Sequence, residues 1–163
     1  MPGSLAALVE RHRPELLSYL VRLLGDRQEA EDACQETLLR AHRAFGRLAP
    51  DSNERAWLYR IATNTGLTLA RRRARLTARR SDIDCDALPA RGIASLDHRD
   101  MLRRLARAVE ALPPRQRAAL MLRQFQGLGY ADIATTLGGN EAGARANVYQ
   151  AVKKLRAALG GSP

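Results

Sequence analysis

Residues 130–159, YADIATTLGGNEAGARANVYQAVKKLRAAL, decide the fold of the C-terminal part of the chain. YADIATTLG has the pattern of a short helix, and the following Gly-Gly-Asn predicts a tight turn. Asn140 is a favourable N-cap for a second helix that begins at Glu141. Two helices joined by a short glycine-containing turn form a helix-turn-helix.

The second helix of this pair has two contrasting faces. Its apolar stripe recurs at helical spacing and consists of Ala144, Val148, Ala151, Leu155 and Leu159. Tyr149, Gln150 and Lys153 fall on the opposite side, with Arg145 near its edge. This polar face has the composition of a helix that enters the major groove of DNA. Two-helix hairpins are also common in purely structural bundles, so the pattern leaves both interpretations open.

The rest of the sequence is also helical in pattern. Apolar residues make up 45% of the chain and aromatic residues 4%, so its cores must be built mainly from Leu, Ala, Val and Ile. Gly25 ends a first predicted helix, within which Pro14 marks either a break or a new first turn. Helical periodicity predicts further helices over residues 26–46, 54–75, 101–112 and 115–126. We therefore expect an all-α fold.

One segment interrupts this periodicity. LTARRSDIDCDALPARGIASLDHRD has no sustained period, and it contains a proline, a glycine and three alternating acids, Asp82, Asp84 and Asp86. It is typical of a flexible interdomain linker. We predict two small helical domains, 1–76 and 99–163, joined by a linker over 77–98.

The charge of the chain indicates a polyanionic partner. Lys and Arg number 27 against 17 for Asp and Glu, which gives a formal net charge of +10. Nucleic acid is the partner that this charge favours. A membrane surface would attract the same charge, but the basic stretches lack the apolar face of an interfacial helix. A soluble basic protein without such a partner remains the simpler alternative.

Other classes of protein receive no support from the sequence. No apolar stretch is long enough to span a bilayer, and the N-terminus lacks a signal-peptide pattern, so we expect a cytoplasmic protein without membrane insertion. Cys34 and Cys85 lack metal-site spacing, and His12, His42 and His98 are scattered. We expect no metal site, no cofactor and no catalytic residue. Cys34 lies on a predicted packing face and is interpreted as a core residue.

An arginine-rich stretch follows the predicted turn at 50–53. Arginines lie at 55, 60, 71, 72, 73, 75, 79 and 80, near Trp57 and Tyr59. Basic and aromatic residues together are used to bind the backbone and bases of nucleic acids. Trp57 also has the helical spacing of a core residue, and the arginines also fit a solvated helix end.

Three segments resemble one family. AEDACQETLLRA (30–41), PDSNERAWLYRIATN (50–64) and LPPRQRAALMLRQFQGLGYADIATTLG (112–138) are similar to the sigma-70 family, specifically its extracytoplasmic-function group. The resemblance covers about Leu16 to Leu159, with the segments in the family's order. It implies a transcription-initiation specificity subunit of RNA polymerase that catalyses no reaction, with a region 2 bundle and a region 4 helix-turn-helix domain.

The resemblance assigns roles to residues of the first domain. It implies that core polymerase is bound by Asp32, Gln35, Glu36, Leu39 and Arg40. It implies a loop that captures a base of the −10 element, with Asn64 at the base of the pocket. It implies that the −10 contacts are made by Asp51, Ser52, Asn53, Arg55, Trp57, Arg60, Asn64, Arg71, Arg72 and Arg73. An extruded base can be recognised by an amide that both donates and accepts hydrogen bonds.

For the second domain the resemblance implies contacts to the −35 element. The residues are Arg123, Arg145, Asn147, Tyr149, Gln150 and Lys153. This chain departs from the family in AGARAN and in Gln150 and Val152, where basic residues are more usual. Because of these departures, the sequence does not predict which −35 element the chain recognises. The linker acids either mimic nucleic acid or are ordinary solvated residues. Many members of this group are restrained by an anti-sigma protein, but no residue of this chain indicates one.

Two other functions fit the sequence less well. A stand-alone helix-turn-helix transcriptional regulator would leave the acidic helix around Asp32 without a role. An enzyme acting on nucleic acid would need clustered carboxylates or histidines, which the sequence does not place together. The sequence therefore favours a polymerase subunit with core RNA polymerase and promoter DNA as partners.

Overall fold

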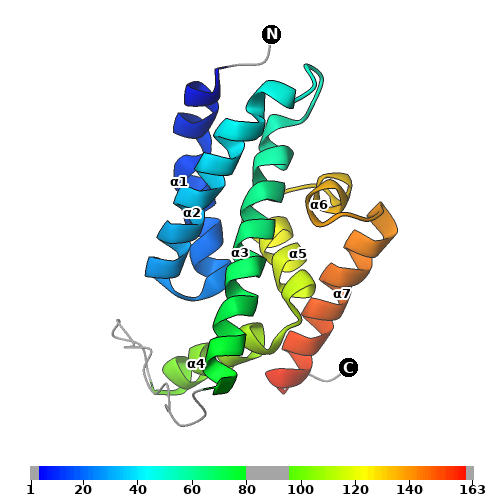
Figure 1. Cartoon of the computed structure of the whole chain (residues 1–163). Coiled ribbons are helices and arrows are strands. Elements are labelled where there is room, and N and C mark those ends of the chain that lie inside the picture. Colours follow the sequence, from blue (N-terminus) through cyan, green and yellow to red (C-terminus); the bar gives the residue numbers. More distant parts are fainter. Residues whose placement is uncertain (1–3, 80–95, 161–163) are drawn as a thin grey trace.

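The first domain is a bundle of three helices. The computed structural model describes residues 4–79 and 96–160. Helices α1 (Leu5–Leu24), α2 (Arg27–Ala44) and α3 (Glu54–Arg79) pack against one another, and a short 3₁₀ turn, Phe45–Arg47, follows α2 (Figure 1). The predicted caps are present. Asp26 Oδ1 accepts from the Glu29 amide at 2.9 Å, and Gly25 ends α1 with φ of 73°.

Two tyrosines lie at the centre of this bundle. The rings of Tyr19 and Tyr59 meet edge to face with centroids 5.3 Å apart, a favourable arrangement of aromatic quadrupoles. Tyr19 is fully buried, and its hydroxyl is 2.7 Å from Thr63 Oγ1. Leu16, Leu20 and Leu58 are buried in the same core, which is otherwise made mainly of the aliphatic residues that the composition predicts.

The second domain contains four helices. They are α4 (Leu96–Ala111), α5 (Pro114–Gln124), α6 (Tyr130–Leu137) and α7 (Glu141–Ala158). Pro114 occupies the first turn of α5, where no backbone donor is lost. Gly138 turns the chain between α6 and α7 with φ of 73°, and Asn140 Oδ1 caps α7 by accepting from the Gly143 amide at 2.7 Å. The helix-turn-helix prediction is confirmed.

Three boundaries differ from the sequence expectation. Helix α1 continues through Pro14. Helix α3 extends to Arg79 and α4 begins at Leu96, so helices occupy both ends of the predicted linker, because the Ala-, Leu- and Arg-rich ends favour helix. Residues 80–95, with Asp82, Asp84, Asp86 and Cys85, lie outside the described residues.

The two domains pack against each other. Helix α6 lies against α3, and α5 lies against α1, and Figure 1 shows α5, α6 and α7 along one side of α3. A continuous cluster of buried apolar residues joins the two domains, with Leu20 and Leu58 on one side and Leu122 and Ile133 on the other. This packing was not predicted from the sequence, and it brings the candidate site residues of the two domains close together.

Candidate polymerase and nucleic-acid interface

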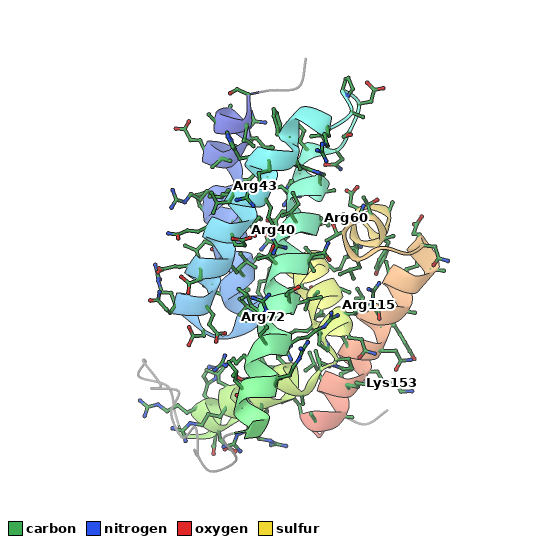
Figure 2. The ribbon with its side chains drawn as sticks, viewed as in Figure 1. Arg40, Arg43, Arg60, Arg72, Arg115 and Lys153 are labelled. Carbon is green, nitrogen blue, oxygen red and sulfur yellow. The ribbon has the colours of Figure 1, made fainter. Side chains whose placement is uncertain are left out.

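Helix α7 presents its polar face to solvent. Its apolar stripe is buried at Ala144, Val148 and Ala151. On the other side, the side chains predicted to contact the −35 element are exposed or half-buried, and Tyr149 is 65% exposed. Lys153 projects from the same helix (Figure 2). An exposed aromatic ring among basic and amide side chains can contact base edges and phosphates together.

The ring of Tyr130, the first residue of α6, contacts two of the predicted DNA-binding arginines. The Cζ atom of Arg123 on α5 is 4.3 Å from the ring centroid, and that of Arg145 on α7 is 4.9 Å from it. Arg123 also donates to the Leu128 carbonyl at 3.1 Å, and Arg145 donates to Glu141 at 3.1 Å. The three helices thus meet at one aromatic side chain.

Helix α3 carries a basic surface along its length. Arg60, Arg71 and Arg72 are exposed, and Figure 2 shows Arg60 and Arg72 on this helix. Arg73 is held by Glu29 of α2 at 3.1 Å. Exposed guanidinium groups in such a row suit the phosphate backbone of a nucleic acid.

The loop before α3 is held at its C-terminal end by Asn53. Asn53 Oδ1 accepts from the Ala56 amide at 3.0 Å and caps α3, while its Nδ2 donates to Asp132 Oδ1 of α6 at 3.1 Å. Asp51 is exposed and Ser52 is half-buried. Asn64 is exposed eleven residues further along α3, which places it roughly 16 Å from Asn53 along the helix axis. The predicted pocket residues are therefore not in contact in this structure.

Arg55 lies in a polar network between the domains. It donates to both carboxylate oxygens of Glu15, at 3.2 and 3.1 Å, and to the carbonyl of Gln126 at 2.8 Å. The hydrogen bond to Glu15 raises the pKa of Arg55. Burial alone would raise the pKa of Glu15, but hydrogen bonds from Arg55 and His12 outweigh it and lower that pKa. Arg55 is thus less available to DNA here than Arg60.

Trp57 packs within the first domain. It is half-buried against the hydrophobic core, and its ring lies 6.2 Å from that of Phe45. This contact supports the core interpretation of Trp57, whereas its predicted contact with DNA stays a prediction.

The exposed face of α2 combines charges with one large apolar side chain. Asp32 and Gln35 are exposed, and Glu36 accepts from Arg40 Nε at 2.9 Å. Leu39 lies among them and is 54% exposed. An apolar side chain ringed by charged and polar groups is typical of the centre of a protein interface.

The comparisons with known proteins identify the family. Residues 8–76 match the model of Sigma-70 region 2, and residues 102–155 match that of Sigma-70, region 4. The chain is 34% identical over 157 residues to the ECF RNA polymerase sigma factor SigL of Mycobacterium tuberculosis, covering 94% of this chain and 87% of that protein. The chain belongs to the extracytoplasmic-function group of sigma-70 factors.

The chain covers different fractions of the length of two further relatives. SigE of Mycolicibacterium smegmatis is 34% identical over 152 residues, and the chain covers 59% of that sigma factor's length. The solved structure of the sigma factor RpoE from Bartonella quintana, in complex with the anti-sigma factor NepR, superposes with a TM-score of 0.75 at 26% identity. The superposition covers 97% of this chain and 98% of the RpoE chain. The likeness therefore includes the relative placement of the two domains.

Sequence reasoning missed the polar contacts between the two domains of this sigma factor. Tyr59 donates from its hydroxyl to Gln126 Oε1 at 2.7 Å, in a buried position, and Arg55 donates to the carbonyl of the same glutamine. Burial raises the pKa of Tyr59, so the hydroxyl stays protonated and donates. No local pattern identifies Gln126, which precedes a glycine turn and resembles a loop residue.

The contact between Tyr59 and Gln126 gives a testable stability effect. We expect Gln126→Leu to lower the free energy of unfolding by about 2 kcal/mol, because the buried Tyr59 hydroxyl loses its acceptor. Urea denaturation measures this difference. Gln124→Leu, at an exposed position two residues earlier, is the matched control. Adding Tyr59→Phe should recover part of the loss by removing the unsatisfied hydroxyl, and no recovery would contradict this explanation.

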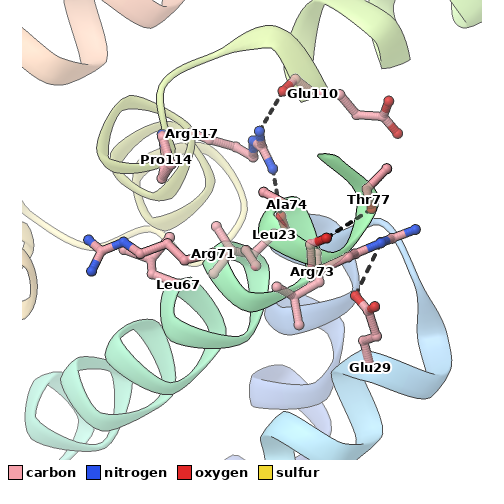
Figure 3. A pocket seen from close by; sticks show the side chains of 12 residues that line it. Leu23, Glu29, Leu67, Arg71, Arg73, Ala74, Thr77, Glu110, Pro114 and Arg117 are labelled. Atoms are coloured by element: carbon pink, nitrogen blue, oxygen red, sulfur yellow. Dashed lines mark hydrogen bonds and ion pairs between the residues drawn. The ribbon is translucent and has the colours of Figure 1, made fainter. Parts of the chain in front are cut away.

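A cleft lies beside the domain contact. It has a volume of about 670 Å³ and is lined by apolar side chains such as Leu67, by Arg71 and Arg73 of α3, and by Arg117 of α5 (Figure 3). Within residues 4–79 and 96–160, no three His, Cys, Asp or Glu side chains are placed to hold a metal ion. In the same residues, no helix is long and apolar enough to cross a membrane.

Proposed function

We propose that this chain binds core RNA polymerase through the exposed face of α2 and directs transcription initiation from promoters with −10 and −35 elements. The observation that carries the proposal is Leu39, a large apolar side chain exposed among charges on the region 2 bundle whose α3 is basic. The face suits a protein partner, and the arginines suit DNA. A stand-alone regulator needs the second surface but has no use for the first.

The proposal gives each domain one promoter element. Residues 1–76 would meet the −10 element through the loop at 51–53 and the row of arginines on α3, and residues 99–163 would meet the −35 element through α7. In this assignment the side chains bind and orient nucleic acid, and the chain supplies no catalytic group. Because core polymerase acts on the chromosome, the proposal also places the chain in the cytoplasm.

Engagement of the −10 element by the loop competes with polar contacts between the two domains. Asn53 is bonded to Asp132 of α6, and Arg55 is bonded to Gln126. A base entering the loop competes for the same amide of Asn53. We infer that polymerase and promoter binding favour an open arrangement and that a protein gripping both domains favours the closed one. The sigma factor RpoE of Bartonella quintana was solved in complex with the anti-sigma factor NepR, and we propose an anti-sigma partner for this chain.

The deciding experiment is transcription from a promoter library. Purified chain and core polymerase are incubated together with random promoter sequences, and the run-off transcripts are sequenced. We expect enrichment of a two-element promoter that depends on both components. Specific DNA binding without core polymerase would support the stand-alone regulator, and failure to bind core polymerase at low salt would overturn the proposal.

Replacing Asn64 tests the assignment of the −10 pocket. We expect Asn64→Ala to slow promoter opening by about tenfold, because an amide contact to a base edge is lost, while core binding changes less than twofold. Permanganate reactivity of unpaired thymines measures opening, and competition with labelled sigma measures core binding. Gln28→Ala, an exposed amide on α2, is the control. An equal loss of opening and core binding would count against the pocket.

A further inference from the structure

Tyr130 differs from the other aromatic rings that contact arginine. Among the described residues, Phe125 contacts Arg22 and Tyr59 contacts Arg55, each ring meeting one guanidinium at the domain junction. Tyr130 contacts two guanidinium groups, those of Arg123 and Arg145, within the second domain. Its neighbours thus come from the helices before and after its own.

Two cations at one ring need a compensating interaction. Both Cζ atoms lie within 5 Å of the same centroid, at 4.3 and 4.9 Å, so two positive charges are held close to one ring. The negative face of the ring attracts each cation, and Glu141 offsets part of the charge at Arg145. Glu141 and Arg145 are both largely exposed, so that ion pair is weak. A bound phosphate group would neutralise the remaining positive charge.

Stacking leaves the hydrogen-bonding edges of both arginines available. A guanidinium contacts a ring with its face, whereas its five N–H donors point outward in its own plane. Arg123 uses an N–H for the carbonyl of Leu128, and Arg145 uses an N–H for Glu141. Contact with the ring restricts the motion of both guanidinium groups, which lowers the entropy lost when a phosphate is bound.

We propose that Tyr130 is a positioning residue that aligns Arg123 and Arg145 as one clamp for the phosphate backbone of duplex DNA. The inference rests on the proposed function of α7 in −35 binding and adds a residue that the sequence analysis did not assign. The clamp is independent of base sequence because its ligand is phosphate. It compensates for the recognition helix, which has Gln150 and Val152 at positions where basic residues are more usual.

The test measures binding of the full-length chain to a 20-base-pair duplex of random sequence over a series of salt concentrations. We expect Arg123→Ala and Arg145→Ala each to reduce the slope of log affinity against log salt by about one. Tyr130→Leu should weaken binding about fivefold, and Tyr130→Phe, which keeps the ring face, should stay within twofold of the wild type. Arg145→Lys, which keeps the charge but not the planar group, should behave like Tyr130→Leu.

Two controls separate positioning from general damage to the fold. Phe125→Leu removes an exposed ring that contacts Arg22 and should leave duplex binding unchanged. In a chain that already lacks both arginines, Tyr130→Leu should have no further effect, because its role acts through them. A further loss in that background, or wild-type binding by both Tyr130→Leu and Arg145→Lys, would overturn the proposal.

The outcome of this duplex-binding test can be distinguished from a failure of the proposed function. If promoter-specific transcription fails while Tyr130→Leu still weakens duplex binding through the two arginines, the clamp stands and the sigma assignment falls. If transcription succeeds and Tyr130→Leu binds the duplex as the wild type does, the sigma assignment stands and the clamp falls.

Discussion

Arg117→Met should lower the free energy of unfolding by about 3 kcal/mol, because one guanidinium satisfies the ends of two helices. Arg117 donates to the carbonyls of Val109, Glu110 and Leu112 around the C-terminus of α4, at 3.1, 2.5 and 3.2 Å. It also donates to the carbonyl of Leu23 near the C-terminus of α1, at 3.2 Å (Figure 3). Methionine fills similar space but leaves these carbonyls without the donor.

The measurement is urea denaturation with fluorescence of Trp57, which lies in the first domain. Arg107→Met on the exposed side of α4 is the matched control and should change stability by less than about 0.5 kcal/mol. Arg117→Lys should recover only part of the loss, since an ammonium cannot reproduce the planar arrangement of donors. A loss below about 1 kcal/mol for Arg117→Met would mean that water replaces the guanidinium at these helix ends.

Leu39→Asp should weaken the binding of core polymerase by at least about thirtyfold, because it places a carboxylate at the centre of the proposed interface. Leu39 is 54% exposed, so the change should leave the free energy of unfolding nearly unaltered. Fluorescence anisotropy of the labelled chain, titrated with core polymerase, measures the affinity.

A second exposed leucine provides the comparison for Leu39. Leu76 on α3 is 62% exposed, lies outside the proposed polymerase-binding face, and can also be replaced by aspartate. We expect Leu76→Asp to bind core polymerase within threefold of the wild type. Equal losses for the two variants would indicate a general effect of added negative charge, and the polymerase face would then have to be sought elsewhere.

Local sequence signals predicted most helix boundaries correctly. Asp26 and Asn140 cap helices because their side chains reach backbone amides three residues on, and Gly25 ends α1 because glycine adopts positive φ without strain. Pro14 misled the prediction. Its local cost of about 3 kcal/mol is offset by packing on both sides of it, where Leu8 and Leu16 are buried in the same bundle.

Of the candidate site, the sequence predicted the exposure of those side chains whose position on a helix follows from helical periodicity. The polar face of α7 and the arginines of α3 are exposed for that reason. The contacts of Asn53 with Asp132 and of Tyr59 with Gln126 join residues far apart in the sequence. No periodicity or motif encodes such a pair, because it depends on how the two bundles pack against each other. The roles proposed for these side chains at a promoter stay predictions.

The length of helix α3 determines how far apart its two groups of predicted DNA-binding residues lie. It runs without interruption from the loop at 51–53 through the arginines at 71–73. Arg55 and Arg73 are eighteen residues apart, which corresponds to about 27 Å of rise along a helix. A duplex lying along α3 would span roughly eight base pairs over that distance. In the proposed complex, one uninterrupted helix therefore sets the distance between the captured base and the upstream backbone contacts. We expect this distance to be the same at every promoter that the chain recognises.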